Sequence, residues 1–302
     1  MTEQRLLFIL AMDQRDSIEE KLYGLDGAPT PEQSADIAAN KLLVYRGLLD
    51  ALPDLPEQAR PGFLVDEQYG ASPAVLAAAD DRVSLAMPLE ASGQEWFDFE
   101  FGTDWREHAG FFGADHPKVL IRDNPGLDEE ERSQQAFKVA QIAGWASEQS
   151  LEFIVELLVP ATDDDLARVD GDQDRYDREV RPELTVRSME FLQDHGVDPA
   201  IWKIEGLDRR EDAERVAATA RRGDRTGRCI VLGRHAPQEK LDEWLRVAAP
   251  VEGFAGFAIG RSNWWDALQG RLSGDLDEAA ARKQVAENYA HYVRTYLDAR
   301  GA

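Results

Sequence analysis

Two lysines lie within stretches that otherwise have the composition of buried strands. Lys203 stands in the apolar stretch 200–207 (AIWKIEGL), and Lys118 opens the stretch 118–122 (KVLIR). The chain has only seven lysines beside twenty-seven arginines, and lysine is almost never fully buried without a partner. One explanation is that Lys203 points outward or pairs with Glu205. Because the same pattern occurs twice, we predict instead that both lysines belong to one chemical site.

A carboxylate in a third apolar stretch indicates which chemistry that site would perform. Glu156 interrupts residues 152–159 (EFIVELLV). Two lysines and a carboxylate in a dry cavity suit Schiff-base formation with a carbonyl compound, for which one lysine has to be neutral. A second ammonium about 6 Å away contributes roughly 2.8 kcal/mol toward this at an effective dielectric of about 20. We therefore expect Lys203 to be the nucleophile, Lys118 its activator and Glu156 the group that carries protons.

The elements that position these side chains alternate between strand and helix. Short apolar runs predict strands at 6–13, 62–66, 83–90, 118–122, 152–159, 201–205, 228–233 and 254–260. Amphipathic spacing predicts helices at 17–23, 34–52, 129–149, 184–195, 211–222, 239–248 and 277–299. Eight such units in 302 residues fit a closed (β/α)8 TIM barrel, and no G-x-G-x-x-G follows the first strand. We predict one α/β domain that spans 1–302.

In such barrels the active site lies at the carboxyl ends of the strands. The polar residues predicted there as catalytic or substrate-binding, besides the two lysines and Glu156, are Asp13, Gln14, Arg15, Asp66, Gln68, Glu90, Arg122, Glu205, Gly233, Arg234, Gly260 and Arg261. Two Gly-Arg pairs, at 233–234 and 260–261, follow the seventh and eighth strands, where barrel enzymes often bind phosphate. The alternative is that both arginines are salt-bridged residues of the rim.

Composition and charge exclude several other classes of function. A net charge of −24 makes nucleic acid an improbable partner, and no apolar run is long enough to span a membrane. The N-terminus lacks a signal peptide, so we expect a cytoplasmic protein, with homo-oligomers left open. The single cysteine, Cys229, and the spacing of the five histidines give no metal site, so neither a metal nor another cofactor is expected.

Several motifs resemble one enzyme family across nearly the whole chain. The segments 8–15 (FILAMDQR), 64–70 (LVDEQYG), 153–160 (FIVELLVP), 202–207 (WKIEGL) and 256–261 (GFAIGR) resemble the aldolase domain of inositol catabolism, which is similar to class I tagatose-bisphosphate aldolases. By this resemblance, Lys203 corresponds to the Schiff-base lysine, Lys118 to the second lysine, Glu156 to the proton-transfer glutamate, Asp13 to the aspartate of the first strand and Arg261 to a phosphate-binding arginine. Asp16 departs from the glycine that many relatives carry there.

The resemblance implies a substrate, the phosphorylated keto-sugar acid 2-deoxy-5-keto-gluconate 6-phosphate, cleaved to dihydroxyacetone phosphate and malonate semialdehyde. Glu156 or Asp13 would be the base for carbon–carbon cleavage, and Arg15 or Arg122 would hold the distal carboxylate. One alternative is a tagatose-bisphosphate or sulfosugar-phosphate aldolase of the same mechanism. Another is a barrel that binds a sugar phosphate and regulates a partner without catalysis.

Overall fold

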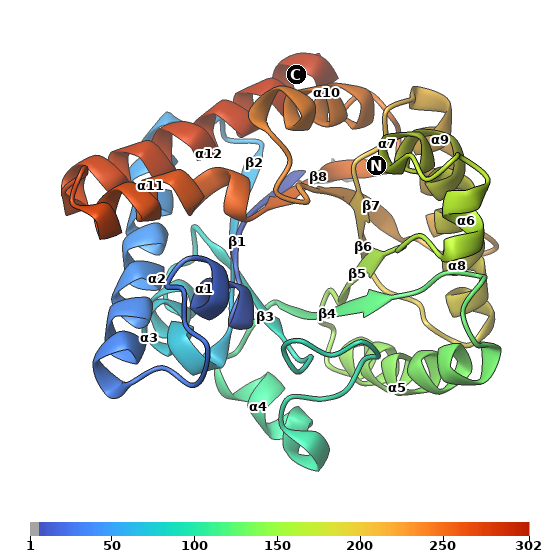
Figure 1. Cartoon of the computed structure of the whole chain (residues 1–302), viewed down its shortest axis with the longest axis horizontal. Coiled ribbons are helices and arrows are strands. Elements are labelled where there is room, and N and C mark those ends of the chain that lie inside the picture. The colour runs from blue at the N-terminus through green and yellow to red at the C-terminus, as the bar shows by residue number, and fades with distance from the viewer. Residues whose placement is uncertain (1–5, 302) are drawn as a thin grey trace.

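The chain folds into a closed barrel of eight parallel strands inside a ring of helices (Figure 1). The computed structural model describes residues 6–301. Each strand pairs with the next along the chain, and β8 pairs with β1 to close the ring. The strands are β1 (Leu6–Met12), β2 (Ala59–Val65), β3 (Ser84–Pro88), β4 (His116–Arg122), β5 (Ile154–Leu158), β6 (Ile201–Glu205), β7 (Arg228–Leu232) and β8 (Phe254–Ile259). The predicted (β/α)8 barrel is thereby confirmed.

The helices of the outer ring lie between successive strands, except for the last two, which follow the last strand. They are α1 (Asp16–Lys21), α2 (Pro31–Ala51), α3 (Glu67–Ala78), α4 (Trp105–Phe111), α5 (Glu129–Glu148), α6 (Asp163–Ala167), α7 (Gln173–Arg175), α8 (Arg181–Asp194), α9 (Arg210–Ala220), α10 (Gln238–Ala248), α11 (Arg261–Ser273) and α12 (Glu278–Arg300). Three short segments, η1 (Leu52–Asp54), η2 (Gly102–Asp104) and the π-helical η3 (Tyr176–Val180), complete the regular structure. Sequence periodicity missed α3, which contains Gly70 and Pro73, and α11, which directly follows β8.

Alternate residues of each strand face two different cores, as the two-residue period of a strand requires. In β1, Phe8 and Leu10 belong to the core between the barrel and the helices, whereas Leu7, Ile9 and Ala11 belong to a second core inside the barrel. The inner core is completed by Leu64, Ala86, Ile154, Ile201, Ile230 and Ala258. The barrel is therefore filled by an apolar layer, above which polar side chains project toward its carboxyl-terminal mouth.

Helix α12 closes the seam between the first strand and the last. The Tyr289 hydroxyl donates to the Phe8 carbonyl at 2.7 Å, and the Tyr296 hydroxyl accepts from the Gly256 amide at 3.0 Å. Trp264 of α11 is fully buried, and its indole N–H donates to the Ala11 carbonyl at 2.9 Å. These bonds tie β1 and β8 to the last two helices, and Trp264 packs against the carboxyl end of β1.

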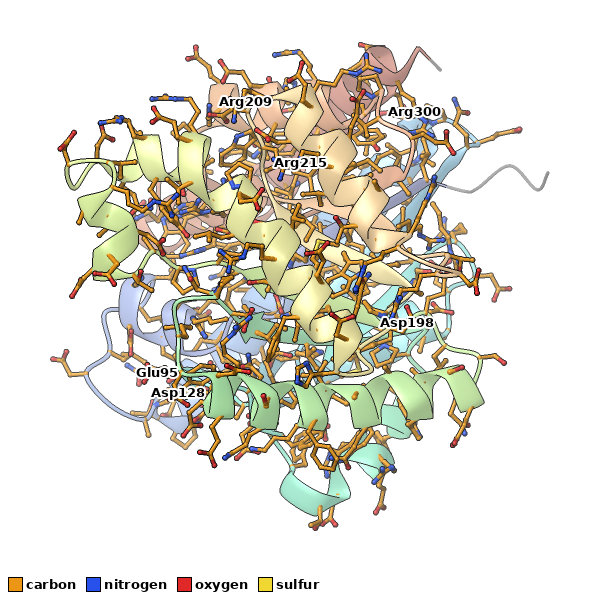
Figure 2. All side chains as sticks on the ribbon, turned by 90° about the vertical axis from the view of Figure 1, so that its right-hand side faces the viewer. Glu95, Asp128, Asp198, Arg209, Arg215 and Arg300 are labelled. Atoms are coloured by element: carbon orange, nitrogen blue, oxygen red, sulfur yellow. The ribbon has the colours of Figure 1, made fainter. Side chains whose placement is uncertain are left out.

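The outer surface of the barrel carries much of the charge of the chain. Figure 2 shows Arg209, Arg215 and Asp198 on the outside of the molecule, around the helices. Arg215 of α9 pairs with Glu183 of α8, and Arg209 pairs with Asp212 at 2.9 Å. Among residues 6–301, no helix is long and apolar enough to cross a membrane.

Candidate active site

The carboxyl ends of the strands surround a cavity of about 920 Å³. Ala11, a member of the inner apolar layer, also lines this cavity, so the two are in direct contact. Most residues predicted from the sequence line it, namely Asp13, Gln14, Arg15, Glu90, Lys118, Arg122, Glu156, Lys203, Glu205, Arg234, Gly260 and Arg261. The expectation that these strand ends meet at one site therefore agrees with the geometry.

Lys203 and Glu156 face each other on neighbouring strands. They are register partners in the β5–β6 ladder, and the Lys203 Nζ lies 2.9 Å from the Glu156 Oε2. The Lys203 side chain is only 3% exposed, so its amino group is largely removed from bulk water. A buried amine in contact with a carboxylate has an adjacent proton acceptor, which is the arrangement that a lysine nucleophile needs.

Lys118 lies at the centre of a cluster of carboxyl groups. Its Nζ is 2.8 Å from the Asp13 Oδ2, 2.5 Å from the Glu90 Oε1 and 2.8 Å from the Glu156 Oε2. The Glu156 Oε2 atom therefore contacts both lysines. The predicted meeting of Lys118, Glu156 and Lys203 inside the barrel agrees with these contacts. We call Asp13, Glu90, Lys118, Glu156 and Lys203 the lysine–carboxylate cluster.

The electrostatics of the cluster favour ion pairs. Burial opposes the ionisation of Asp13, but the charges of Lys118 and Lys203 outweigh it and hold its pKa well below the usual range. Burial likewise opposes the ionisation of Glu156, whose pKa the same two lysines lower. Burial alone would lower the pKa of Lys118, but the surrounding carboxylates raise it well above its ordinary value. Lys118 is therefore a permanent cation of the site.

These contacts change the role expected for Lys118. An isolated second ammonium would make Lys203 easier to deprotonate, which was the expectation from the sequence. Three carboxyl groups surround Lys118, however, and one of them, Glu156, contacts both ammonium groups. The geometry favours a different task for Lys118, which is to hold Asp13, Glu90 and Glu156 in place.

Arg15 is engaged by the loop that follows β3. Its guanidinium donates to the Glu90 carbonyl at 2.7 Å and lies 3.0 Å from the Glu100 carboxylate. Residues Glu90 and Phe99 form an isolated antiparallel bridge, so the loop returns on itself at this point. Arg15 thus joins the end of β1 to this loop, and its charge is already matched by Glu100.

Asp66 and Gln68, which were predicted to bind substrate, do not line the cavity. Asp66 is buried below it, where it pairs with the fully buried Lys41 and accepts the Tyr69 amide at 2.9 Å as the N-cap of α3. Lys41 also donates to the Met12 and Gln14 carbonyls, both at 2.8 Å. Gln68 is exposed on α3. The prediction that Asp66 binds substrate is therefore wrong. Asp66 instead holds Lys41, which supports the end of β1.

The two Gly-Arg pairs differ in their surroundings. Arg234 pairs with Asp177 at 2.8 Å and with Glu205 at 3.0 Å, which is the salt-bridged alternative considered from the sequence. Gly233 does not line the cavity. Within residues 6–301, Arg261 makes no ion pair, and it begins α11 at the cavity wall. A Cβ on Gly260 would lie 3.0 Å from the Ala11 carbonyl oxygen, so glycine allows α11 to start this close to β1.

Other lining residues were not predicted from the sequence. Asp177 and Tyr176 come from η3, and His235 follows Arg234. Arg234 and His235 both have positive φ, at 51° and 59°, in a turn closed by the bond from the Ala236 amide to the Gly233 carbonyl. Burial and the charge of Arg261 lower the pKa of His235, so this ring is neutral near neutral pH. A histidine directly after the first predicted Gly-Arg pair was a signal for it in the sequence.

The described residues contain no candidate metal site. Between residues 6 and 301, no group of three or more His, Cys, Asp and Glu side chains has an arrangement that could hold a metal ion. Glu205 accepts the Val159 amide at 2.9 Å in addition to its pair with Arg234. Arg122 donates to the Gln94 carbonyl at 2.7 Å. The polar groups that line the cavity include lysine, carboxylate and arginine side chains.

Comparison with solved structures identifies other barrels of this fold. A fructose-bisphosphate aldolase from Plasmodium falciparum, in complex with TRAP and a small-molecule inhibitor, superposes with a TM-score of 0.66 at 14% identity, over 95% of this chain and 90% of that one. A Schiff base-forming fructose-1,6-bisphosphate aldolase gives 0.54 at 17% identity, over 95% of both chains. A structural-genomics protein from Corynebacterium glutamicum gives 0.57 at 17% identity, over 99% of this chain and 88% of that one. At these identities the similarity shows the fold alone.

Sequence comparison adds a family. The comparison with curated proteins finds no match. Residues 1–300 match a family described as "Uncharacterized protein conserved in bacteria (DUF2090)". That match spans nearly all of the 302 residues, and therefore the chain belongs to the DUF2090 family.

Proposed function

We propose that this protein is a class I aldolase, a carbon–carbon lyase that forms a Schiff base with a phosphorylated keto sugar. The observation that carries the proposal is the contact between the buried Lys203 Nζ and the Glu156 carboxylate at 2.9 Å in the cavity at the mouth of the barrel. Binding alone would not require a buried lysine beside a proton acceptor. One of the structures of similar fold is itself a Schiff base-forming aldolase, which supports the proposal.

The first half of the reaction joins the substrate to Lys203. Glu156 takes a proton from the Lys203 ammonium, and the free amine attacks the ketone carbon to give a carbinolamine. Protonated Glu156 then returns the proton to the carbinolamine hydroxyl, which leaves as water while the C–N bond becomes an iminium. The net change is one ammonium and one ketone converted to one iminium and one water, so Glu156 ends as it began.

The second half of the reaction breaks a carbon–carbon bond. For 2-deoxy-5-keto-gluconate 6-phosphate the iminium forms at C5, and a carboxylate removes the proton of the C3 hydroxyl. The C3–C4 bond then breaks, C3 becomes the aldehyde of malonate semialdehyde, and the electron pair forms a C4–C5 enamine. Protonation at C4 and hydrolysis release dihydroxyacetone phosphate. Asp13 and Glu156 both line the cavity and are the candidate bases for the cleavage step.

The arrangement of cations supports a substrate with an anion at each end. Arg261 follows β8 and Arg122 ends β4, and these two strands are opposite each other in a ring of eight. Neither guanidinium is matched by a carboxylate among residues 6–301. The start of α11 adds backbone N–H groups near Arg261, where a phosphate would be favoured. We assign the phosphate to Arg261 and the distal carboxylate to Arg122.

Borohydride trapping tests the proposed chemistry. The protein is incubated with dihydroxyacetone phosphate, reduced with borohydride, and mapped by peptide mass spectrometry with and without a chelator. We expect a stable adduct on Lys203 that is unaffected by chelation, because the iminium forms without a metal. A folded protein that binds the ketone phosphate without an adduct would support the binding-protein alternative instead, and an adduct on Lys118 would reverse the roles of the two lysines.

A comparison of cleavage rates tests the identity of the substrate. Rates of cleavage are compared for 2-deoxy-5-keto-gluconate 6-phosphate, tagatose 1,6-bisphosphate and a sulfosugar phosphate. We expect the keto-sugar acid to give the highest kcat/KM, because Arg122 offers a single guanidinium for a carboxylate at the far end. A preference for the bisphosphate would instead support the alternative that the protein is a tagatose-bisphosphate aldolase, with the same mechanism.

Arg261→Met should raise KM for the phosphorylated substrate by about 10- to 100-fold, because it removes a charge-assisted hydrogen bond worth about 1.5–3 kcal/mol. Arg234→Met is the matched control, since this arginine already pairs with Asp177 and Glu205 and has little charge to offer a phosphate. Steady-state kinetics of both variants check the assignment. Equal effects on KM, or a larger effect at Arg234, would contradict a phosphate site at Arg261.

A further inference from the structure

Glu90 is the member of the lysine–carboxylate cluster with the least compensation for a negative charge. Its Oε1 contacts Lys118 at 2.5 Å, while its Oε2 is buried and makes no hydrogen bond within the described residues. The side chain is 10% exposed and lines the cavity. An ionised carboxylate normally accepts hydrogen bonds at both oxygens when it is buried. Glu90 satisfies only one of them.

Few hydrogen-bond donors lie around Glu90. Lys118 donates hydrogen bonds to Asp13 at 2.8 Å and to the Glu90 Oε1 at 2.5 Å, while its contact with Glu156 at 2.8 Å is an ion pair without hydrogen-bond geometry. Within residues 6–301, no hydrogen bond from Lys118 reaches the Glu90 Oε2. The nearest arginine does not supply one, because Arg15 donates to the Glu90 carbonyl and pairs with the Glu100 carboxylate. Among the described residues, Lys118 is therefore the only hydrogen-bond donor to the Glu90 carboxylate.

The charges of the cluster do not balance if every group is ionised. Two lysines face three carboxyl groups, so the cluster itself contains one more acid than base. Arg261 adds a further positive charge that acts on Asp13 and Glu156. An uncompensated buried charge is costly, and the usual outcome is that one group takes up a proton. Glu156 contacts both lysines, and Asp13 feels both of their charges, so each is better compensated than Glu90.

We propose that Glu90 keeps a proton in the resting site and acts through Lys118 as a positioning residue, which leaves the two lysines balanced by Asp13 and Glu156. With this balance, transfer of a proton from Lys203 to Glu156 removes one positive and one negative charge together. If Glu90 were ionised, the extra negative charge would strengthen the hold of Lys203 on its proton and slow the formation of the free amine. This consequence rests on the proposed aldolase function, whereas the protonation state of Glu90 does not.

The groups around Glu90 support the proposal. Burial raises the pKa of Glu90, Lys118 opposes the rise, and the negative charge of Asp13 adds to it. The charged groups that face Glu90 from the elements packed around it are Lys118 of β4, Asp13 and Arg15 after β1, Glu100 of the returning loop and, across Lys118, Glu156 of β5. Arg15 also opposes the rise, but it acts less strongly than burial, Lys118 and Asp13, and the net effect is a raised pKa for Glu90.

Infrared spectroscopy of the whole chain tests the proton directly. The C=O stretch of a protonated carboxylic acid is separate from the carboxylate bands, and it shifts in D2O. We expect the wild type near neutral pH to show this band and Glu90→Gln to lose it. Glu20→Gln, at an exposed glutamate of the same cavity, is the matched control and should keep it. Absence of a D2O-sensitive band in the wild type, or its persistence in the Glu90 variant, would overturn the proposal.

Thermal unfolding gives a second readout that needs no activity. A group whose pKa is raised by folding contributes stability below its unfolded pKa and loses it as the pH rises through the folded pKa. The wild type should therefore lose this contribution as the pH rises, while Glu90→Gln, which has no proton to lose, should not. The difference in Tm between variant and wild type is expected to grow with pH. A constant or shrinking difference would contradict a protonated Glu90.

Trapping kinetics connect the proton to Lys203. The ratio of borohydride-trapping rates, Glu90→Gln over wild type, should lie near one at acidic pH and rise as Glu90 ionises in the wild type. A ratio that does not change with pH would show that Glu90 has no influence on Lys203. If neither protein is trapped at any pH, the aldolase proposal fails, and the infrared and unfolding results still decide the protonation of Glu90.

Discussion

Lys203→Met is expected to lower kcat/KM for aldol cleavage by about 10⁵-fold or more, a loss of the order measured when a covalent nucleophile is removed. Methionine keeps the apolar stem but cannot attack a carbonyl, so no iminium forms and the carbon–carbon bond has no electron sink. Glu156 retains its contact with Lys118, so the carboxylate is not left unpaired. Steady-state kinetics and borohydride trapping on the same preparation measure the effect.

The control for this variant is a lysine that lines the same cavity outside the cluster. Lys21 is exposed at the end of α1, and Lys21→Met removes a positive charge without touching Glu156. Borohydride trapping of the substrate on Lys203 should persist in the Lys21→Met variant. A Lys203→Met protein that is folded by circular dichroism and still cleaves substrate at a substantial fraction of the wild-type rate would rule out a Schiff base on this residue.

The sequence was sufficient to predict the part of the site that depends on strand neighbours. Apolar strands were found at 201–205 and around Glu156, and consecutive strands of a barrel are adjacent, so Lys203 and Glu156 had to lie close together. The same reasoning predicted that Lys118 lies on the strand next to that of Glu156. The boundary of β2 was less well predicted, because it begins at Ala59, before the apolar run that starts at 62.

Contacts that depend on loops were beyond such reasoning. Arg234 was predicted to face a phosphate, but Asp177 approaches it from η3, which is 57 residues away in the chain. Its position follows from the path of the segment between β5 and β6, and no periodic pattern encodes that path. The pair of Lys41 with Asp66 was also missed, although a lysine in the apolar stretch of α2 was a visible signal for a buried partner.

Lys118→Met is expected to lower the free energy of unfolding by about 3–5 kcal/mol near neutral pH, since breaking a buried ion pair leaves uncompensated charge. Asp13, Glu90 and Glu156 would lose the cation that contacts all three. Among the described residues, Lys203 contacts only the Glu156 carboxylate of these three, so it does not replace Lys118 at Asp13 or Glu90. Denaturant unfolding of the variant and the wild type at several pH values gives the difference. The variant is also expected to lose most of its activity, because the carboxylates that serve Lys203 would move.

The pH dependence separates loss of charge from loss of packing. Lys118 holds the pKa of Asp13 down, so the stability that Asp13 contributes is present above its ordinary pKa of 3.8 and is lost as the pH falls below it. In the variant the carboxyl groups take up protons more readily, and the penalty should shrink from neutral toward acidic pH. Lys138→Met, which removes an exposed pair with Asp98, should change stability by about 0.5 kcal/mol or less. A penalty at Lys118 that is equal at all pH values would mean that packing, and not the balance of charge, makes this lysine necessary.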